Sequence, residues 1–124
     1  MKKKILLIGK NSFIGSNINF YLKKKFIITN LNFNQFKKLN KNKFKQFDYI
    51  CNCSVNEKYI NHKYNIKNDF DIQIANSIKN YNINYIFLSS RKVYKPMFNT
   101  NEKQKLNAID NYSRNKIITE KNLK

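Results

Sequence analysis

The sequence predicts an α/β fold in which an open parallel sheet is covered by helices on both faces. Short apolar runs alternate with segments of helical spacing, and this alternation favours parallel strands joined by crossover helices. A glycine turn, Gly9–Gly15, joins the first apolar run to the first helical pattern. Small polar residues, among them Ser54 and Ser90, follow later apolar runs. In a parallel sheet these strand ends line one crevice, where ligands bind.

The first strand is expected at Ile5–Ile8, because this apolar run lies between lysines and a glycine and is typical of a strand buried on both faces. The second and third strands are expected at Phe26–Thr29 and Tyr49–Cys53. Little room remains between them, so we expect any extra strand there to be short or missing. Two helical patterns fill the intervals, the first with Ile14, Ile18, Tyr21 and Leu22, the second with Phe33, Phe36, Lys37 and Leu39. A polar, lysine-rich link is expected before Phe47.

The second half continues the alternation. Glu57–Lys67 is polar and is expected to be a loop, after which Asn68 is a candidate helix cap. One face of that helix carries Phe70, Ile74, Ile78 and Tyr81. Tyr85–Leu88 is expected to be the next buried strand, and Met97–Asn107 a polar loop. A final helix is expected to be capped by Asp110 or Asn111.

Composition limits the possible functions. A chain of 124 residues is large enough for one domain with a single core. Its formal net charge of +18 would suit a polyanion, but the lysines are scattered from Lys2 to Lys124 rather than clustered. We therefore expect no specific nucleic-acid partner. No apolar run approaches the roughly 20 residues of a membrane span, and the run after Met1 is too short for a secretion signal. We expect a cytoplasmic protein.

The cysteines and the histidine do not predict a metal site. Cys51 and Cys53 alternate with Asn52 on a predicted strand, so both side chains point to one side of the sheet as reduced thiols. The single histidine, His62, has no cysteine or histidine at metal-ligand spacing.

The glycine turn predicts an anion site. A strand, a glycine turn and a helix N-terminus together point free backbone N–H groups and the helix dipole at a phosphate. The residues concerned are Gly9, Asn11, Ser12, Phe13, Ile14 and Gly15. Ser12 stands where a three-glycine fingerprint has its middle glycine, and its hydroxyl could itself bond a phosphate. An ordinary strand-to-helix turn is the alternative.

Tyr112 and Lys116 are candidate proton-transfer residues. They lie four residues apart on a predicted helix, and so on the same face. A phenol ordinarily titrates near pKa ~10, and a positive charge nearby favours the phenolate. We expect Lys116 to lower the pKa of Tyr112. A lone match to this spacing is weak, because tyrosine and lysine are abundant in the chain.

Six segments in order resemble the extended short-chain dehydrogenase/reductases, the NAD-dependent epimerase/dehydratase family that acts on nucleotide sugars. These are KILLIGKNSFIGS, Asp48–Ser54, Asn68 in IKNDF, Tyr85–Tyr94, Glu102, and Tyr112–Lys116 with Glu120. The resemblance covers nearly the whole chain. It implies a Rossmann-like doubly wound parallel sheet, here truncated before the last strands and the C-terminal substrate lobe. It also implies one incomplete NAD(P)-binding domain over residues 1–124, and a possible homodimer.

By this resemblance, the glycine turn would hold the dinucleotide pyrophosphate, with Cys53, Ser54 and Ser89 at neighbouring strand ends. Tyr112 would be the general acid/base, and Lys116 would also hold the nicotinamide ribose. Ser90 would bond the reacting oxygen of a nucleotide-sugar substrate. At the end of the second strand Thr29 and Asn30 stand where an acid would exclude a 2′-phosphate, so both NAD and NADP remain open.

The sequence departs from the family at several positions. Arg91 and Lys92 stand where dehydratases carry an acidic pair, which favours an epimerase or ketone reductase. Lys95 and Asn115 also differ from the usual residues. The absence of the substrate lobe predicts weak cofactor binding and little turnover for the chain as it stands. The alternative is a catalytically silent Rossmann-like module or a basic binding protein. The sugar, the cofactor and the oligomeric state are not specified by the sequence.

Overall fold

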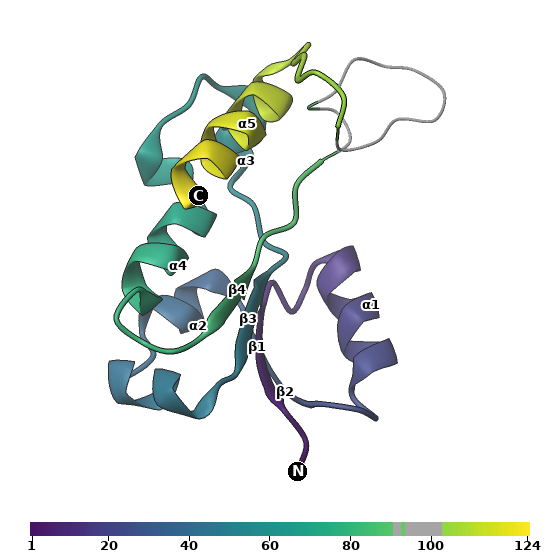
Figure 1. Ribbon diagram of the computed structural model, residues 1–124, viewed down its shortest axis with the longest axis vertical. Helices are drawn as coiled ribbons and strands as arrows, with labels where there is room; N and C mark the ends of the chain where they lie inside the picture. Colours follow the sequence, from purple (N-terminus) through teal and green to yellow (C-terminus); the bar gives the residue numbers. More distant parts are fainter. Residues whose placement is uncertain (91–92, 94–102) are drawn as a thin grey trace. The chain divides into compact units, whose positions relative to one another are not determined.

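The computed structural model describes residues 1–90, 93 and 103–124 (Figure 1). The chain divides into two compact units, which are described separately. The sheet unit comprises Met1–Ser54 and Ile74–Leu88. The α5 unit comprises Val55–Gln73 and Ser89–Lys124.

The sheet unit contains four parallel strands in the order β2-β1-β3-β4. Their bounds are β1 Lys4–Ile8, β2 Ile27–Leu31, β3 Tyr49–Asn52 and β4 Asn84–Ile86. Within the described residues no strand lies between β2 and β3 along the chain, which confirms the predicted gap. β2 begins one residue later than predicted and runs to Leu31, and β4 is shorter than predicted.

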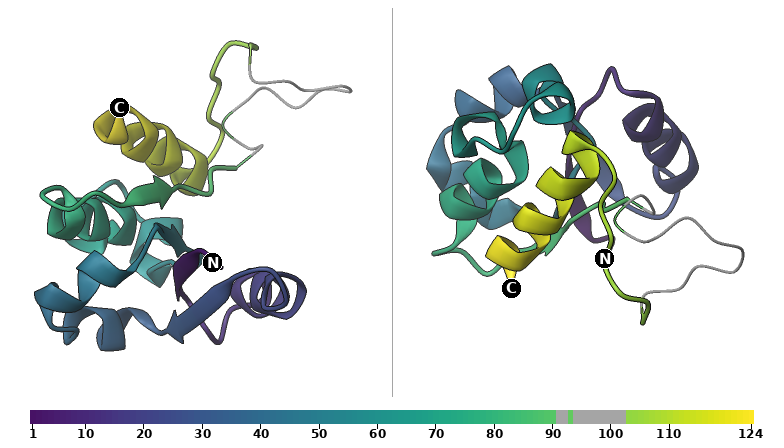
Figure 2. Two further views of the ribbon diagram at one scale, coloured as in Figure 1. Left: turned by 60° about the horizontal axis from the view of Figure 1, so that its bottom comes forward. Right: turned by 90° about the horizontal axis from the view of Figure 1, so that it is seen from above.

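Helices cover both faces of this sheet, as the sequence predicts. The first helix, α1 (Phe13–Leu22), lies on one face and α2 (Phe33–Lys37) on the other (Figures 1 and 2). The central strand β1 is therefore enclosed, and Leu6, Leu7 and Ile8 are fully buried. Continuous apolar runs of this kind are typical of strands in parallel sheets.

Two segments expected to be irregular contain short helices instead. The lysine-rich link forms the 3-10 helix η1 (Lys41–Gln46), and the predicted loop at Glu57–Lys67 contains α3 (Glu57–Asn61). The 3-10 helix η2 (Ile66–Asn68) follows. In each case an asparagine side chain just before the helix accepts a hydrogen bond from a first-turn N–H: Asn40, Asn56 and Asn65. This capping stabilises helical turns in otherwise polar sequence.

The α5 unit contains α3, α5 (Asn111–Leu123) and the start of α4 (Phe70–Ile78). Asp110 caps α5: its carboxylate accepts from the Ser113 N–H at 2.8 Å, and Ser113 Oγ in turn accepts from the Asp110 N–H. The predicted N-cap of α4, Asn68, is wrong by one residue. The cap is Asp69, whose carboxylate accepts a hydrogen bond from the Ile72 N–H at 3.1 Å. An aspartate carboxylate is as good an N-cap acceptor as an asparagine amide.

Part of the predicted loop at Met97–Asn107 lies outside the described residues. Of the helices that the structure describes, none is long and apolar enough to cross a membrane.

Candidate functional site

The glycine turn of the sheet unit is built by backbone hydrogen bonds between β1, β2 and α1. The Gly9 N–H donates to the Leu31 carbonyl at 2.7 Å, which ties the end of β1 to the end of β2. Ser12 is the N-cap of α1: its Oγ accepts from the Gly15 N–H at 2.9 Å and donates to the Gly9 carbonyl at 2.8 Å. Hydrogen bonds to the backbone of Gly9 and of Gly15 therefore hold both ends of the turn in place.

Both glycines are required by the space and the backbone around them. Gly9 has a φ of 105°, in the left-handed region, and a Cβ there would lie 2.9 Å from the backbone of Cys53 and Ser54. A Cβ on Gly15 would collide with the Gly9 carbonyl oxygen and would lie 2.8 Å from Ser12 Oγ. The turn therefore depends on two positions that only glycine can occupy without rearrangement.

The start of α1 presents backbone donors. Within the described residues, the N–H groups of Phe13 and Ile14 make no hydrogen bond. The positive end of the helix dipole adds to these donors, a combination that suits an anion. The structure does not support the expectation that the Ser12 hydroxyl donates to a phosphate. Because its single proton goes to the Gly9 carbonyl, its hydroxyl orders the turn rather than donating to a phosphate.

An unsatisfied polar atom lies at the end of β2. Asn30 Oδ1 is buried and has no hydrogen-bond partner among the described residues. Such an atom costs free energy unless a donor reaches it. A hydroxyl group of a bound ligand would supply that donor. Asn30 and the glycine turn thus share the carboxyl end of the sheet, since β1 and β2 are parallel neighbours.

The carboxyl end of β3 is held by Asn52, whose role the sequence analysis missed. The buried Asn52 side chain accepts from both the N–H and the Oγ of Ser54, at 2.9 and 2.6 Å. The N–H of Cys53 donates to the Ile8 carbonyl at 2.7 Å. The Sγ atoms of Cys51 and Cys53 lie 3.9 Å apart without a disulfide between them, so the two side chains lie on one side of the sheet, as predicted.

In the α5 unit, the buried Lys116 lies beside the buried Tyr59, Asp69 and Asp71 and the half-buried Tyr112. We call this the Tyr112–Lys116 cluster. Lys116 Nζ lies 3.9 Å from Asp71 Oδ2, and both side chains are only 8% exposed. The same Nζ lies 5.6 Å from the Tyr112 ring centre and 5.7 Å from that of Tyr59. The two rings meet edge to face at 6.2 Å.

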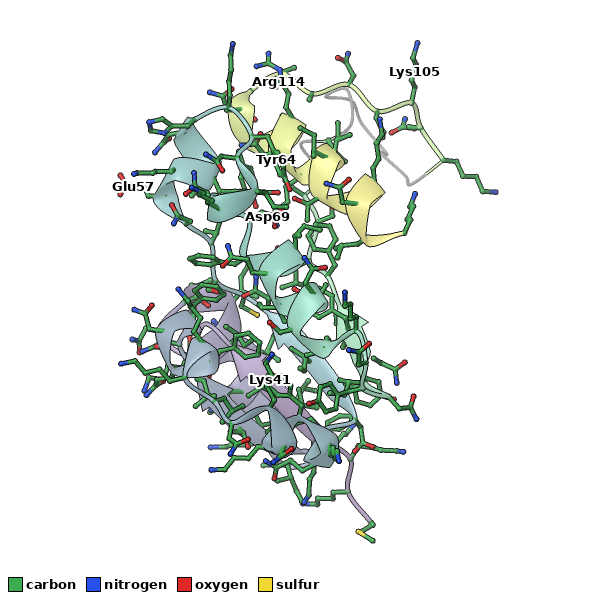
Figure 3. All side chains as sticks on the ribbon, turned by 90° about the vertical axis from the view of Figure 1, so that its left-hand side faces the viewer. Lys41, Glu57, Tyr64, Asp69, Lys105 and Arg114 are labelled. Atoms are coloured by element: carbon green, nitrogen blue, oxygen red, sulfur yellow. The ribbon has the colours of Figure 1, made fainter. Side chains whose placement is uncertain are left out.

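A series of side-chain hydrogen bonds through Thr119 connects two members of the cluster, Tyr59 and Asp69. The fully buried Asp69 accepts from Thr119 Oγ1 at 2.7 Å and from Tyr64 Oη at 2.8 Å. Tyr59 Oη lies 2.6 Å from Thr119 Oγ1. Tyr64 and Asp69 lie close together in Figure 3, whereas Glu57 and Arg114 point outward. Asn115, noted only as a departure from the family, donates its Nδ2 to the carbonyls of Tyr59 and His62, at 2.7 and 2.9 Å.

The electrostatics of this cluster differ from the expectation. Burial, reinforced by the negative charges of Asp71 and Asp110, raises the pKa of Tyr112 above its ordinary value. Burial lowers the pKa of Lys116, and Asp71, Asp69 and Glu120 oppose that shift. The expected lowering of the Tyr112 pKa is therefore not what the described structure gives. Burial of the phenol is the larger cause of this upward shift in pKa, and the carboxylates of Asp71 and Asp110 add to it.

The remaining predicted site residues follow β4. Ser89 is exposed and Ser90 is half-buried, and the Ser90 carbonyl accepts from the Val93 N–H at 3.2 Å. Arg91, Lys92, Tyr94, Lys95 and Glu102 lie outside the described residues. The structure thus brings together Gly9, Ser12, Gly15, Cys53 and Ser54 in the sheet unit, and Tyr112 with Lys116 in the α5 unit. No three of the described histidines, cysteines, aspartates and glutamates form a metal-binding group.

Comparison with solved structures shows the fold. A dTDP-4-dehydrorhamnose reductase from Clostridium acetobutylicum has a TM-score of 0.72 over 97% of this chain, at 18% identity. A UDP-N-acetylglucosamine 4-epimerase from Methanobrevibacter ruminantium, in complex with UDP-N-acetylmuramic acid, has a TM-score of 0.72 over 99%, at 22% identity. A dTDP-glucose 4,6-dehydratase from Bacillus anthracis, in complex with NAD, has a TM-score of 0.72 over 96%, at 19% identity.

These similarities confirm the predicted Rossmann-like fold. The chain spans 48% of the reductase, 50% of the epimerase and 48% of the dehydratase. No protein-family model matches the sequence, and no curated protein sequence matches it.

Proposed function

We propose that this chain is the NAD(P)-binding part of a sugar-nucleotide epimerase or ketone reductase. The observation that carries the proposal is the glycine turn: two obligatory glycines, and a capped helix start whose first two N–H groups make no hydrogen bond to any described residue. The buried Asn30 oxygen beside it likewise receives no hydrogen bond from the described part of the chain. Its residues fit a dinucleotide. The N–H groups of Phe13 and Ile14 would bind the pyrophosphate, and Asn30 would accept from a ribose hydroxyl.

Tyr112 is the proposed proton donor or acceptor, with Lys116 beside it and Ser90 as a hydrogen-bond partner of the reacting oxygen. Cys53, Ser54 and Ser89, at the carboxyl ends of β3 and β4, would line the rest of the cofactor site. When bound, the nicotinamide would supply hydride chemistry. The solved structures with this fold include enzymes crystallised with NAD and with UDP-sugars, which supports this class of cofactor and substrate. A cytoplasmic location stays a prediction.

A silent Rossmann-like module is the second candidate. The high pKa of Tyr112 favours it, because a phenol that holds its proton firmly is a poor base at neutral pH. Such a module would bind polyanions through its lysines in a strongly salt-dependent way, without a preference for reduced nicotinamide dinucleotides.

The test is a titration of the chain with NADH and with NADPH at physiological salt, followed by nicotinamide fluorescence. We expect saturable binding of at least one dinucleotide. Gly15→Val should abolish it, whereas Ser16→Ala, at an exposed position on the same helix, should leave it unchanged. A folded chain that binds neither dinucleotide would contradict the proposal.

Asn30→Asp provides the second variant and identifies the cofactor. A carboxylate at this strand end would accept from ribose hydroxyls but repel a 2′-phosphate. The substitution should therefore weaken NADPH binding more than NADH binding. Equal loss of both would contradict the assignment of Asn30 to the ribose.

A further inference from the structure

Large apolar side chains are exposed where α1 ends and β2 begins. Phe20 and Tyr21, in the last turn of α1, are 63% and 71% exposed, and Ile27, the first residue of β2, is 48% exposed. Exposed apolar side chains that gather on one part of a surface, with polar residues around them, mark interaction sites. None of these side chains contributes to the glycine turn, which lies at the opposite end of α1.

Lysines adjoin these apolar side chains. Residues 23–25, in the link between α1 and β2, are all exposed lysines. Lys2 and Lys3 lie next to the start of β2, because the Ile27 N–H donates to the Lys3 carbonyl at 3.0 Å. Figure 1 shows the beginning of the chain and the link at the same end of the sheet. We call these residues together the amino-edge patch: Lys2, Lys3, Phe20, Tyr21, Lys23, Lys24, Lys25 and Ile27.

The positive charge of the amino-edge patch is almost uncompensated. The sheet unit contains a single acidic residue, Asp48, whose Oδ1 lies 3.9 Å from Lys3 Nζ. Both side chains of this pair are largely exposed, so water screens their attraction. Within the described residues, the other lysines of the patch form no ion pair. The patch therefore suits a partner surface that carries many negative charges.

The geometry of the two rings favours a lipid surface over a nucleic acid. Single-stranded nucleic acids stack their bases on open aromatic faces. Lys23 Nζ lies 5.4 Å from the Phe20 ring centre, over one face of that ring, and the Phe20 and Tyr21 rings are nearly perpendicular, at 88°. The rings therefore form no shared stacking plane. Exposed aromatic and aliphatic side chains flanked by lysines are typical of segments that lie in the interface of an anionic bilayer.

We propose that the amino-edge patch binds the surface of a bilayer that contains anionic phospholipids. Phe20, Tyr21 and Ile27 enter the boundary between headgroups and acyl chains, and the lysines contact the lipid phosphates. The attachment is peripheral and needs no spanning helix. The glycine turn lies at the carboxyl ends of the strands, so a chain bound in this way keeps that turn away from the lipid. The inference goes beyond the proposed function and does not depend on it.

The test is co-sedimentation of the chain with lipid vesicles at physiological salt. We expect binding to phosphatidylcholine vesicles that contain roughly one-third phosphatidylserine, and none to vesicles of phosphatidylcholine alone. A lysine near an anionic bilayer strengthens binding by about fivefold. Lys23→Gln, Lys24→Gln and Lys25→Gln combined should therefore weaken binding by about a hundredfold.

The matched control removes the same charge from another part of the sheet unit. It combines Lys38→Gln, Lys41→Gln and Lys43→Gln, which are exposed lysines at the end of α2 and in η1. The control triple variant should weaken binding much less than the patch variant. Equal losses would show that net charge alone drives binding, and would overturn the proposal.

Phe20→Gln combined with Tyr21→Gln tests the apolar part of the patch without changing its charge. Both side chains are exposed and glutamine suits a helix, so the fold should be retained, which circular dichroism checks. We expect about tenfold weaker binding to the phosphatidylserine vesicles, because the rings no longer enter the bilayer. Ile66→Gln, at a 55% exposed position in the α5 unit, is the control and should leave binding unchanged.

Other occupants of the patch give different results. A single-stranded oligonucleotide that binds the patch more tightly than the vesicles do would assign it to nucleic acid. Self-association that Phe20→Gln and Tyr21→Gln abolish, measured by sedimentation velocity without lipid, would assign it to a second copy of the chain. Either result, or a chain that binds neither kind of vesicle, would overturn the proposal. None of these measurements involves NADH or NADPH, so failure here is distinguishable from failure of the proposed function.

Discussion

The glycine turn and the Tyr112–Lys116 cluster hold their candidate residues by different means. The turn is built from backbone groups, with Gly9 and Gly15 in close contact and Ser12 bridging them. It leaves N–H groups and the Asn30 oxygen without partners among the described residues. The cluster is built from side chains, most of them buried, that are joined by an ion pair between Lys116 and Asp71 and by hydrogen bonds through Thr119.

The difference shows which region depends on side-chain identity. Most substitutions around the turn would preserve its backbone geometry, provided that the two glycines remain. In the cluster, a single carboxylate such as Asp71 changes the charge of the whole site. Dinucleotide binding should therefore tolerate sequence change in the turn, whereas the stability of the cluster should be sensitive to single substitutions.

The largest expected effect comes from Gly15→Val. The added side chain would collide with the Gly9 carbonyl and displace Ser12 from its cap, so the turn cannot keep its geometry. We expect loss of dinucleotide binding together with a clear loss of unfolding free energy, measured by urea denaturation. An unaltered affinity would show that the turn does not form the binding site.

Removing half of the buried ion pair should be the next largest effect. Asp71→Asn or Lys116→Met alone removes one half of a buried ion pair, which typically costs about 3–5 kcal/mol. The double variant should cost much less than the sum of the two single variants, as determined by urea unfolding. Lys121→Met, in the exposed last turn of α5, is the control and should be nearly neutral. Additive costs in the cycle would mean that the two charges do not interact.

Substitutions of Ser12 are expected to have smaller effects, and they test how the glycine turn is stabilised. Ser12→Ala removes the α1 cap and should cost about 1 kcal/mol, whereas Ser12→Gly should cost only a few tenths. Both free energies can be measured by urea denaturation. Because the serine hydroxyl donates inward to Gly9, Ser12→Gly should also leave dinucleotide affinity intact. A large loss of affinity in Ser12→Gly would instead assign the hydroxyl to the ligand.

The smallest effect is expected at alkaline pH. Burial, together with the hydrogen bond to Asp69, raises the pKa of Tyr64 to about 12. Its stabilising contribution is therefore complete below the ordinary phenol pKa of about 10 and is lost as pH rises through the folded value. The wild type should lose its stability advantage over Tyr64→Phe between pH ~10 and ~12, measured as the difference in unfolding free energy. An advantage that stays constant across this range would contradict the assignment.

Much of the sheet unit could be predicted from the sequence. The apolar run at Ile5–Ile8 and the glycines after it specify a buried strand and a tight turn without knowledge of distant residues. The missing strand before Asp48 followed from chain length alone. The short helices at Lys41–Gln46 and Glu57–Asn61 could not be recognised, because an asparagine cap stabilises them and asparagine is common throughout this chain.

The cluster was predictable only in part. Helical spacing placed Tyr112 and Lys116 on one face, but the groups that set their charge come from other elements. Asp71 lies 45 residues before Lys116, and Thr119 reaches Asp69 over a separation of 50. No local pattern connects such residues. An aspartate pair around a helix start was the available signal, and it is more often a cap than a partner for a buried lysine.

The central claim is that the glycine turn is a dinucleotide site, and residue-resolved NMR of the isotope-labelled chain during NADH and NADPH titration tests it most directly. The account predicts saturable shifts of the Phe13, Ile14 and Gly15 amides and of the Asn30 side-chain amide. Matched shifts should be absent at the lysine-rich cavity of about 750 Å³ lined by Lys58, Lys63 and Lys67, which serves as an internal control for non-specific anion binding. Shifts confined to those lysines, or none at the turn, would contradict the account.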